Sequence, residues 1–121
     1  WFIYPRRKTM KRKEVLEEAA KLITGDRAEH YGDAFENHAR IAEGWNIIIR
    51  GAMMSHGLLT PAHVALMMDW VKTSRLLESL DHVDSWIAKA GYTALGAELV
   101  GPRNEEIKID RFTNGYVRPK K

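Results

Sequence analysis

The feature that most constrains the fold is the stretch from residue 60 to residue 100, where apolar residues recur every three or four positions. Such spacing places them on one side of an α-helix, which has 3.6 residues per turn. Thr60 and Pro61 suit an N-cap and first helical residue, and the pattern breaks at Ser79 and Leu80. We therefore predict two helices folded back as an antiparallel hairpin that forms the core.

The first helix of this hairpin carries a few charges among its apolar residues. Asp69, Lys72 and Arg75 follow one another at three-residue steps, so they lie along one stripe of the helix. A helix that is apolar on its other sides is largely buried, and an unpaired buried charge is costly. We expect these charges to face a groove, a rim or one another.

The second helix begins with Asp81 and Asp84. One interpretation is structural, with Asp81 as the N-cap and Asp84 in the first turn, where the helix dipole favours a negative charge. The other is functional, because Asp84 shares a helix face with the small residues Ala88 and Gly91. Small residues let a ligand approach closely, and a carboxylate at the head of that face is a candidate ligand for a hard cation.

Two further segments have helical spacing, residues 11–23 and residues 33–50, and residues 51–59 are expected to form a loop. Asp33 and Glu36 fit a capping box at the start of the second of these helices. Together with the hairpin, these segments predict an all-α fold like a four-helix bundle.

The polar segment GDRAEHYGD, which joins the first two helices, contains Arg27, His30 and Tyr31. Polar loops are usually solvated. An arginine, a histidine and a tyrosine presented together are also suited to bind a phosphate or to stack on a base. Asn37 lies one turn further along, has no evident capping role, and is a candidate hydrogen-bonding partner for a base edge.

The two ends of the chain differ from its body. Residues 1–10 are interpreted as an N-terminal extension or tag remnant, residues 11–100 as the helical domain, and residues 101–121 as a basic arm. Within this arm the crude alternation of IKIDRFTNGYV and its Asn114-Gly115 pair predict a short β-hairpin or an extended arm. A lone hairpin is only marginally stable, so we expect it to dock on the helices or on a second subunit.

Charge and composition exclude several classes of protein. Residues 14–110 carry nine basic and sixteen acidic residues, a net charge of −7, so nucleic acid is not the expected partner. The absence of cysteine excludes disulfides and thiolate metal sites. No apolar run approaches the roughly 20 residues of a membrane span, and no signal peptide is evident, so a cytoplasmic protein is expected. No phosphate-binding glycine motif occurs, so phosphate chemistry would rely on carboxylates and a metal.

Three stretches carry a resemblance: GDRAEHYGDAFENHARIAEGW, TPAHVALMMDWVKTSRLL and DHVDSWIAKAGYTALGAEL. Together, over about residues 14–100, they resemble a small all-helical domain of unassigned function common in phages and prophages. More distantly, this group resembles the MazG-like all-α nucleoside triphosphate pyrophosphohydrolases. The resemblance implies a helical homo-oligomer that holds Mg²⁺ or Mn²⁺ on ExxE and ExxD motifs and cleaves (d)NTP to (d)NMP and pyrophosphate. For a phage protein, it implies control of the nucleotide pool in the host cytoplasm.

Carried onto this sequence, the ExxD motif falls on Asp81 and Asp84, and the ExxE motif would fall on Asp69 and Lys72. Lys72 therefore stands where the enzymes have a carboxylate, and Ala88 stands where the phage domains are expected to carry an acid. Glu36 is then a substitute ligand. The metal ligands implied by the resemblance are Asp69, Asp81, Asp84 and Glu36.

In the mechanism that follows from this resemblance, a metal held by Asp84 with Asp81 or Asp69 neutralises the triphosphate and polarises the attacking water. Lys72 and Arg75 stabilise the departing pyrophosphate. The residues expected to bind the rest of the substrate are Arg27, His30, Tyr31, Asn37 and Trp45.

Alternative interpretations keep the fold and omit the chemistry. The chain is then an inactive nucleotide-binding or sequestering protein, or a helical protein that binds a host protein. A further alternative is weak DNA binding through the basic ends, which would be steeply salt-dependent. In each case the helices from Asp33 and from Thr60 are more apolar than one subunit can cover, so we expect a homo-oligomer, most simply a two-fold dimer.

Overall fold

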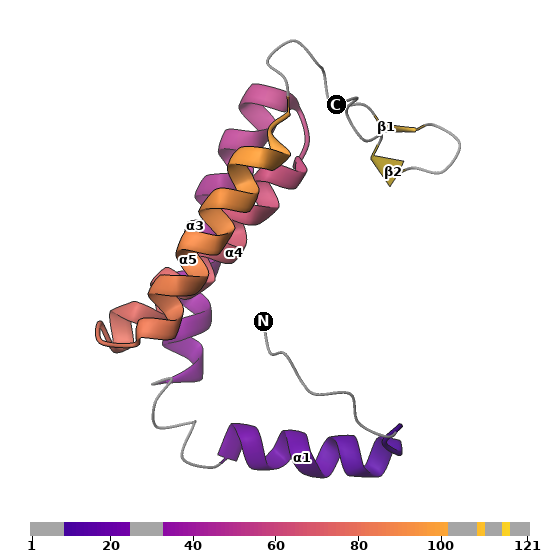
Figure 1. Ribbon diagram of the computed structural model, residues 1–121, viewed down its shortest axis with the longest axis vertical. Helices are drawn as coiled ribbons and strands as arrows, with labels where there is room; N and C mark the ends of the chain where they lie inside the picture. The colour runs from indigo at the N-terminus through magenta and orange to yellow at the C-terminus, as the bar shows by residue number, and fades with distance from the viewer. Residues whose placement is uncertain (1–8, 25–32, 102–108, 111–114, 117–121) are drawn as a thin grey trace.

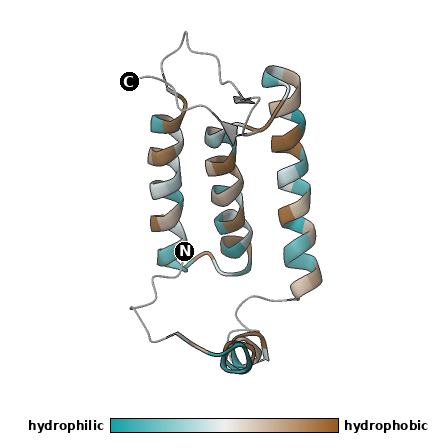
Figure 2. Ribbon diagram, turned by 90° about the vertical axis from the view of Figure 1, so that its right-hand side faces the viewer, coloured by the Kyte–Doolittle hydropathy of each residue, from teal (hydrophilic) through white to brown (hydrophobic). Residues whose placement is uncertain are grey.

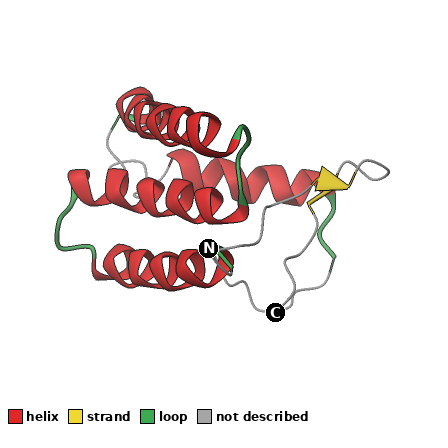
Figure 3. Ribbon diagram, turned by 90° about the horizontal axis from the view of Figure 1, so that it is seen from above, coloured by secondary structure: helices red, strands yellow, loops and turns green. Residues whose placement is uncertain are grey.

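The computed structural model describes residues 9–24, 33–101, 109–110 and 115–116 of the 121-residue chain. The expected all-α fold is confirmed, since these residues form four helices. Figure 3 draws the helices in red. The helices are α1 (Arg12–Thr24), α3 (Ala34–His56), α4 (Pro61–Glu78) and α5 (Val83–Leu99), and the short strands are β1 (Ile109–Asp110) and β2 (Gly115–Tyr116).

Three of the helices lie side by side in one layer, with α4 in the middle (Figures 1 and 2). Helix α4 packs against both α3 and α5, whereas α3 and α5 form no comparable interface within the described residues. No residue of α1 is buried. Three of the four described helices therefore form a layer, and α1 buries no residue against it, so these residues do not pack as the four-helix bundle that we expected.

Helix α3 is longer than its sequence pattern indicated, and the expected loop at residues 51–59 is wrong. The helix continues to His56 and ends at Gly57, whose φ of 75° lies in the left-handed region and whose N–H bonds to the Met53 carbonyl. A single glycine inside a helix, here Gly51, costs only about 1 kcal/mol relative to alanine. The alanine and methionines that follow it are good helix formers, so Gly51 does not end the helix.

Helix α4 begins as predicted, at Pro61 after the N-cap Thr60. The cap is reciprocal, because the Thr60 hydroxyl accepts from the His63 backbone N–H and the His63 ring nitrogen Nδ1 accepts from the Thr60 backbone N–H at 3.2 Å. Helix α3 is capped differently. Asp33 accepts from the Phe35 backbone N–H at 2.9 Å, and Glu36 does not complete the expected box.

The start of α5 corrects another expectation. Asp81 is not the N-cap, since the residue before the helix is His82, which has no side-chain cap bond. The Asp81 carboxylate instead accepts a hydrogen bond from the Ser79 hydroxyl within the α4–α5 turn. Asp84 lies in the first turn of α5, as predicted.

Two tryptophans interlock α3 with α4. The Trp45 indole of α3 donates to the Met67 carbonyl of α4, and the Trp70 indole of α4 donates to the Arg40 carbonyl of α3, both at 2.8 Å. The Trp70 ring covers Gly44, where an added Cβ would lie 1.9 Å from a ring atom. The two helices can approach this closely only because residue 44 has no side chain.

Little apolar surface is buried within the layer. The buried apolar residues are Ala52, Ala65, Leu76 and Tyr92. By contrast, 18 large apolar residues of the described part are exposed, including Phe35, Met54, Ile87 and Leu95. A layer of this kind leaves apolar side chains without a partner, which is unusual for a monomer.

The C-terminal strands pair in antiparallel fashion, with Ile109 opposite Tyr116 and Asp110 opposite Gly115. Asn114 of the expected turn lies outside the described residues. Docking of this arm on the helices stays a prediction. In the described part of the chain, no helix is both long enough and apolar enough to cross a lipid bilayer.

A pH dependence follows from the histidines at the α3–α4 turn. Burial, and then the charge of His56, lowers the pKa of His63 below its usual 6.5; the two ring centroids are 5.2 Å apart. The unfolded chain therefore takes up a proton at a higher pH than the folded chain. We expect this contribution to stability to be complete above pH 6.5 and to be lost as the pH falls through that value.

The experiment compares thermal unfolding from pH 8 to pH 5 in wild type, His63→Gln and His38→Gln. Glutamine at position 63 can complete the capping box but does not titrate. The His63→Gln variant should lose less stability on acidification than the wild type. The exposed His38 is the matched control. An unchanged acid profile in His63→Gln would contradict the prediction.

Candidate functional site

Five of the eight predicted site residues that the structure describes lie at one end of the helix layer. Neighbouring helices run in opposite directions, so α3 and α5 begin at the end where α4 finishes. Glu36 and Asn37 lie in the first turn of α3, and Asp84 lies in the first turn of α5. Arg75 and Asp81 flank the end of α4. The structure therefore brings these five residues to the same end of the layer.

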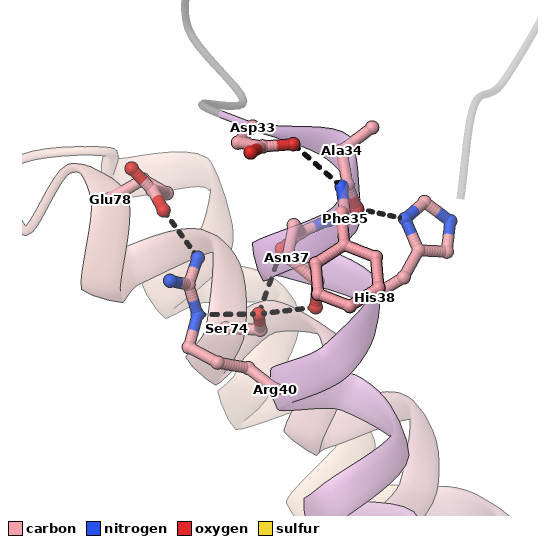
Figure 4. Close-up of polar contacts among 8 residues, drawn as sticks. All are labelled: Asp33, Ala34, Phe35, Asn37, His38, Arg40, Ser74 and Glu78. Atoms are coloured by element: carbon pink, nitrogen blue, oxygen red, sulfur yellow. Dashed lines mark hydrogen bonds and ion pairs between the residues drawn. The ribbon is translucent and has the colours of Figure 1, made fainter.

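A buried serine links α3 to α4 at this end (Figure 4). The Ser74 hydroxyl has no exposed surface, donates to Asn37 Oδ1 at 2.8 Å, and accepts from Arg40 Nε at 3.4 Å. Arg40 also forms an ion pair with Glu78. Asn37 was predicted to bind the substrate, but its side-chain carbonyl oxygen already accepts a hydrogen bond from Ser74.

The α4–α5 turn holds a charged aspartate close to Arg75. Ser79 donates to the Asp81 carboxylate and is the main cause of its lowered pKa. The backbone N–H of Asp81 lowers that pKa further, desolvation opposes this, and the charges of His82 and Arg75 lower the pKa to a smaller extent. Asp81 therefore stays negatively charged and faces solvent at neutral pH.

Asp69, the third aspartate expected to hold the metal, has a protein partner. The Lys89 ammonium of α5 donates to both of its carboxylate oxygens, at 3.1 and 3.0 Å, and also to the Thr73 hydroxyl. An ammonium has three hydrogens, and these three oxygens accept all of them. The Asp69 and Lys89 side chains are 26% and 22% exposed, so the pair lies half-buried in the interface between α4 and α5.

The expected metal centre is not assembled. Asp69 is paired with Lys89, while Asp81, Asp84 and Glu36 are exposed on three separate segments. Among the residues that the structure describes, no three His, Asp or Glu side chains are grouped so that they could hold a metal ion. Asp69, Asp81, Asp84 and Glu36, as placed here, therefore do not form the Mg²⁺ or Mn²⁺ site implied by the resemblance, and metal binding stays a prediction.

The remaining predicted residues divide into two groups. Trp45 and Lys72 are half-buried, and the indole N–H of Trp45 is engaged by the Met67 carbonyl. Arg27, His30 and Tyr31 lie outside the described residues. The substrate-binding roles of all these residues stay predictions.

Sequence reasoning missed Lys89 altogether. The structure shows why Lys89 is half-buried: it lies four residues after Ser85 and three before Tyr92, which are both buried. Residues spaced in this way share a helix face. A lysine on a buried face needs an acidic partner, and Asp69 on the facing helix provides it.

The fold and these contacts define a small all-helical domain whose helices are joined by polar as well as apolar contacts. Residues 14–100 match a family described as a domain of unknown function (DUF6378), and the chain belongs to that family. The chain is also 38% identical, over 91 residues, to the Gene 55 protein of Mycobacterium phage L5. That match covers 75% of this chain and 55% of the phage protein, so the chain spans about half the length of this relative. No solved structure matches the chain.

Family membership and the phage relative confirm the expected resemblance to a small phage domain. The more distant resemblance to the MazG-like pyrophosphohydrolases stays a prediction. Neither the family description nor the printed name of the phage protein states an activity.

Proposed function

We propose that this chain is a phage nucleotide-binding protein that takes the triphosphate of a nucleoside triphosphate against Lys72 and Arg75 of α4. It acts in the host cytoplasm by sequestering the nucleotide rather than by cleaving it. The observation that carries this proposal is the charge of Lys72, which no acid balances in the described part of the chain.

The acids around α4 have other partners. Asp69 is bound by Lys89, Glu78 is bound by Arg40, and the charge of Asp81 is close to that of Arg75. Lys72 is half-buried and forms no ion pair with any described residue. A partly desolvated ammonium favours a nearby anion.

Phosphate oxygens are well suited to this position. Lys72 and Arg75 are three residues apart, so their side chains lie on neighbouring turns of one helix side. An ammonium and a guanidinium at that spacing can bind adjacent phosphate groups. These contacts need no protein-bound metal.

Pyrophosphate release from a nucleoside triphosphate, the reaction implied by the distant resemblance, stays a prediction. Its metal ligands were expected at Asp69, Asp81, Asp84 and Glu36, which are not grouped. An assay for released pyrophosphate distinguishes binding from cleavage, because only cleavage of a nucleoside triphosphate releases pyrophosphate.

We expect nucleoside triphosphates to raise the melting temperature of the protein in EDTA as well as in Mg²⁺. At a ligand concentration 100 times Kd, binding stabilises the folded state by about 2.7 kcal/mol. Lys72→Ala should weaken binding by about tenfold or more, because a hydrogen bond to a charged group contributes roughly 1.5–3 kcal/mol. The measurements are thermal shift and calorimetric titration with all four dNTPs and all four NTPs.

Lys21→Ala is the matched control, since Lys21 is an exposed lysine of α1 that pairs only weakly with Glu18. It should leave affinity unchanged. Pyrophosphate release that disappears in Asp84→Ala would replace the proposal with a hydrolase. A lack of both melting shift and release would refute nucleotide binding.

A protein-binding role is the second candidate, and the 18 exposed large apolar residues favour it. The first partner to consider is a second copy of the chain. In a two-fold contact, the apolar surface of one copy covers the same surface of the other copy. One layer of helices cannot bury that surface alone.

A further inference from the structure

The Lys89 ammonium lies in the interface between α4 and α5, and each of its three hydrogens has an acceptor there. Lys89 Nζ lies 3.1 and 3.0 Å from the two carboxylate oxygens of Asp69, and it also donates to the Thr73 hydroxyl. Two of these acceptors belong to one carboxylate, so the ammonium lies in front of both oxygens at nearly equal distances. A cation bound bidentately by Asp69 would lie in the same place.

An ammonium and a divalent ion cannot share this position. Mg²⁺ and Ca²⁺ bind carboxylate oxygens at about 2.0–2.6 Å, well inside the contacts that Lys89 makes. Displacing the lysine would leave its charge half-buried and next to the incoming ion. Both desolvation and like-charge repulsion oppose this exchange.

The neighbouring residues do not offer an alternative ligand set. Ala88, beside Lys89 in sequence, has no ligating atom, and Lys72 adds a second positive charge on α4. Within the described residues Asp69 is not part of any group of three acids or histidines.

We infer that the Lys89 ammonium is the resident cation of the α4–α5 interface, and that Asp69 holds this lysine instead of a divalent metal. The lysine neutralises Asp69 and ties the two helices together through one carboxylate and one hydroxyl. This inference concerns the protein without any nucleotide, so it does not depend on the proposed function.

The test exchanges the charge at position 89 and uses Mn²⁺ alone as the probe. In Lys89→Glu, two carboxylates face each other across the interface and repel, which lowers the melting temperature. Mn²⁺ should then bind between them and raise the melting temperature by about 5 °C at ten times its Kd. The wild type should show no such rise.

Lys89→Gln is the matched control, because its amide can donate to Asp69 but adds no negative charge. It should be less stable than the wild type and should not respond to Mn²⁺. A response in Lys89→Gln equal to that in Lys89→Glu would show that Mn²⁺ binds elsewhere and would overturn the interpretation of the rise.

A second measurement keeps the inference testable if Lys89→Glu does not fold. Free Mn²⁺ is counted by electron paramagnetic resonance in wild type and in Asp69→Asn. The two proteins should bind the same amount of Mn²⁺, since Asp69 is already occupied. Loss of a bound Mn²⁺ in Asp69→Asn would overturn the inference, whatever the protein does with nucleotides.

Discussion

Gly44→Ala is expected to lose about 2 kcal/mol of unfolding free energy, with a fall of roughly 8–16 °C in melting temperature. A Cβ at this position would lie 1.9 Å from Trp70 Cε2 and 2.0 Å from Trp70 Nε1. The indole cannot simply retreat, because its N–H is bonded to the Arg40 carbonyl at 2.8 Å. Overpacking costs about 3 kcal/mol here, and the higher helix propensity of alanine recovers only about 1 kcal/mol.

Gly51→Ala provides the control in the same helix. A Cβ at residue 51 would meet no atom within 4 Å, and the residue is exposed. We expect Gly51→Ala to gain about 0.5–1 kcal/mol. Urea unfolding of both variants gives the comparison, and equal effects would contradict the close packing of α3 on α4. In the double variant Gly44→Ala/Trp70→Leu the two losses should be less than additive, because the smaller side chain removes the clash.

Leu76→Ala should be the most damaging truncation in the helix layer. Leu76 is 3% exposed and lies in the last turn of α4, the middle helix of the layer. Removing a buried leucine side chain costs about 2–5 kcal/mol through lost burial and the cavity that remains. Leu77, the next residue, is 59% exposed and should cost less than about 0.5 kcal/mol when truncated. Chemical denaturation of the two variants measures both values.

The same pair of variants tests whether a second copy of the chain covers the exposed Leu77. If Leu77→Ala costs as much as Leu76→Ala, and the cost shrinks on dilution, a second copy of the chain buries Leu77 in solution. Light scattering on these samples should then give a molar mass of twice 13.9 kDa. A small, concentration-independent cost would be evidence against a contact through Leu77.

Local features of the fold were predictable from the sequence. The helices of residues 60–100 follow from apolar spacing, and the Thr60-Pro61 start follows from cap chemistry, both of which depend only on near neighbours. The prediction of a loop at residues 51–59 was wrong because Gly51 was taken as the end of the helix. The prediction of Asp81 as the N-cap was wrong because its carboxylate is engaged elsewhere. It accepts a hydrogen bond from the Ser79 hydroxyl in the turn.

Contacts between helices were not predictable in the same way. Spacing shows that Asp69 and Lys72 share one helix side, but not that Lys89, 20 residues later, bonds to Asp69. The partner depends on how α5 is rotated and shifted against α4. The approach of Trp70 to Gly44 likewise depends on the register of two helices, and a glycine alone does not reveal it. The predicted metal ligands Asp69, Asp81, Asp84 and Glu36 came from a family resemblance. They belong to separate helices and a turn, and the sequence does not give the relative placement of those segments.

The indole contacts also give the protein a set of optical reporters. Trp45 and Trp70 bond across the α3–α4 interface, and the Trp86 indole donates to the Leu80 carbonyl at the α4–α5 turn, at 2.8 Å. Indole emission shifts to longer wavelength when the ring passes into water. Separation of α3 from α4 and opening of the α4–α5 turn therefore each change the environment of a different tryptophan. Trp→Phe variants show which tryptophan causes each change in emission, so the two events can be followed separately without any added label.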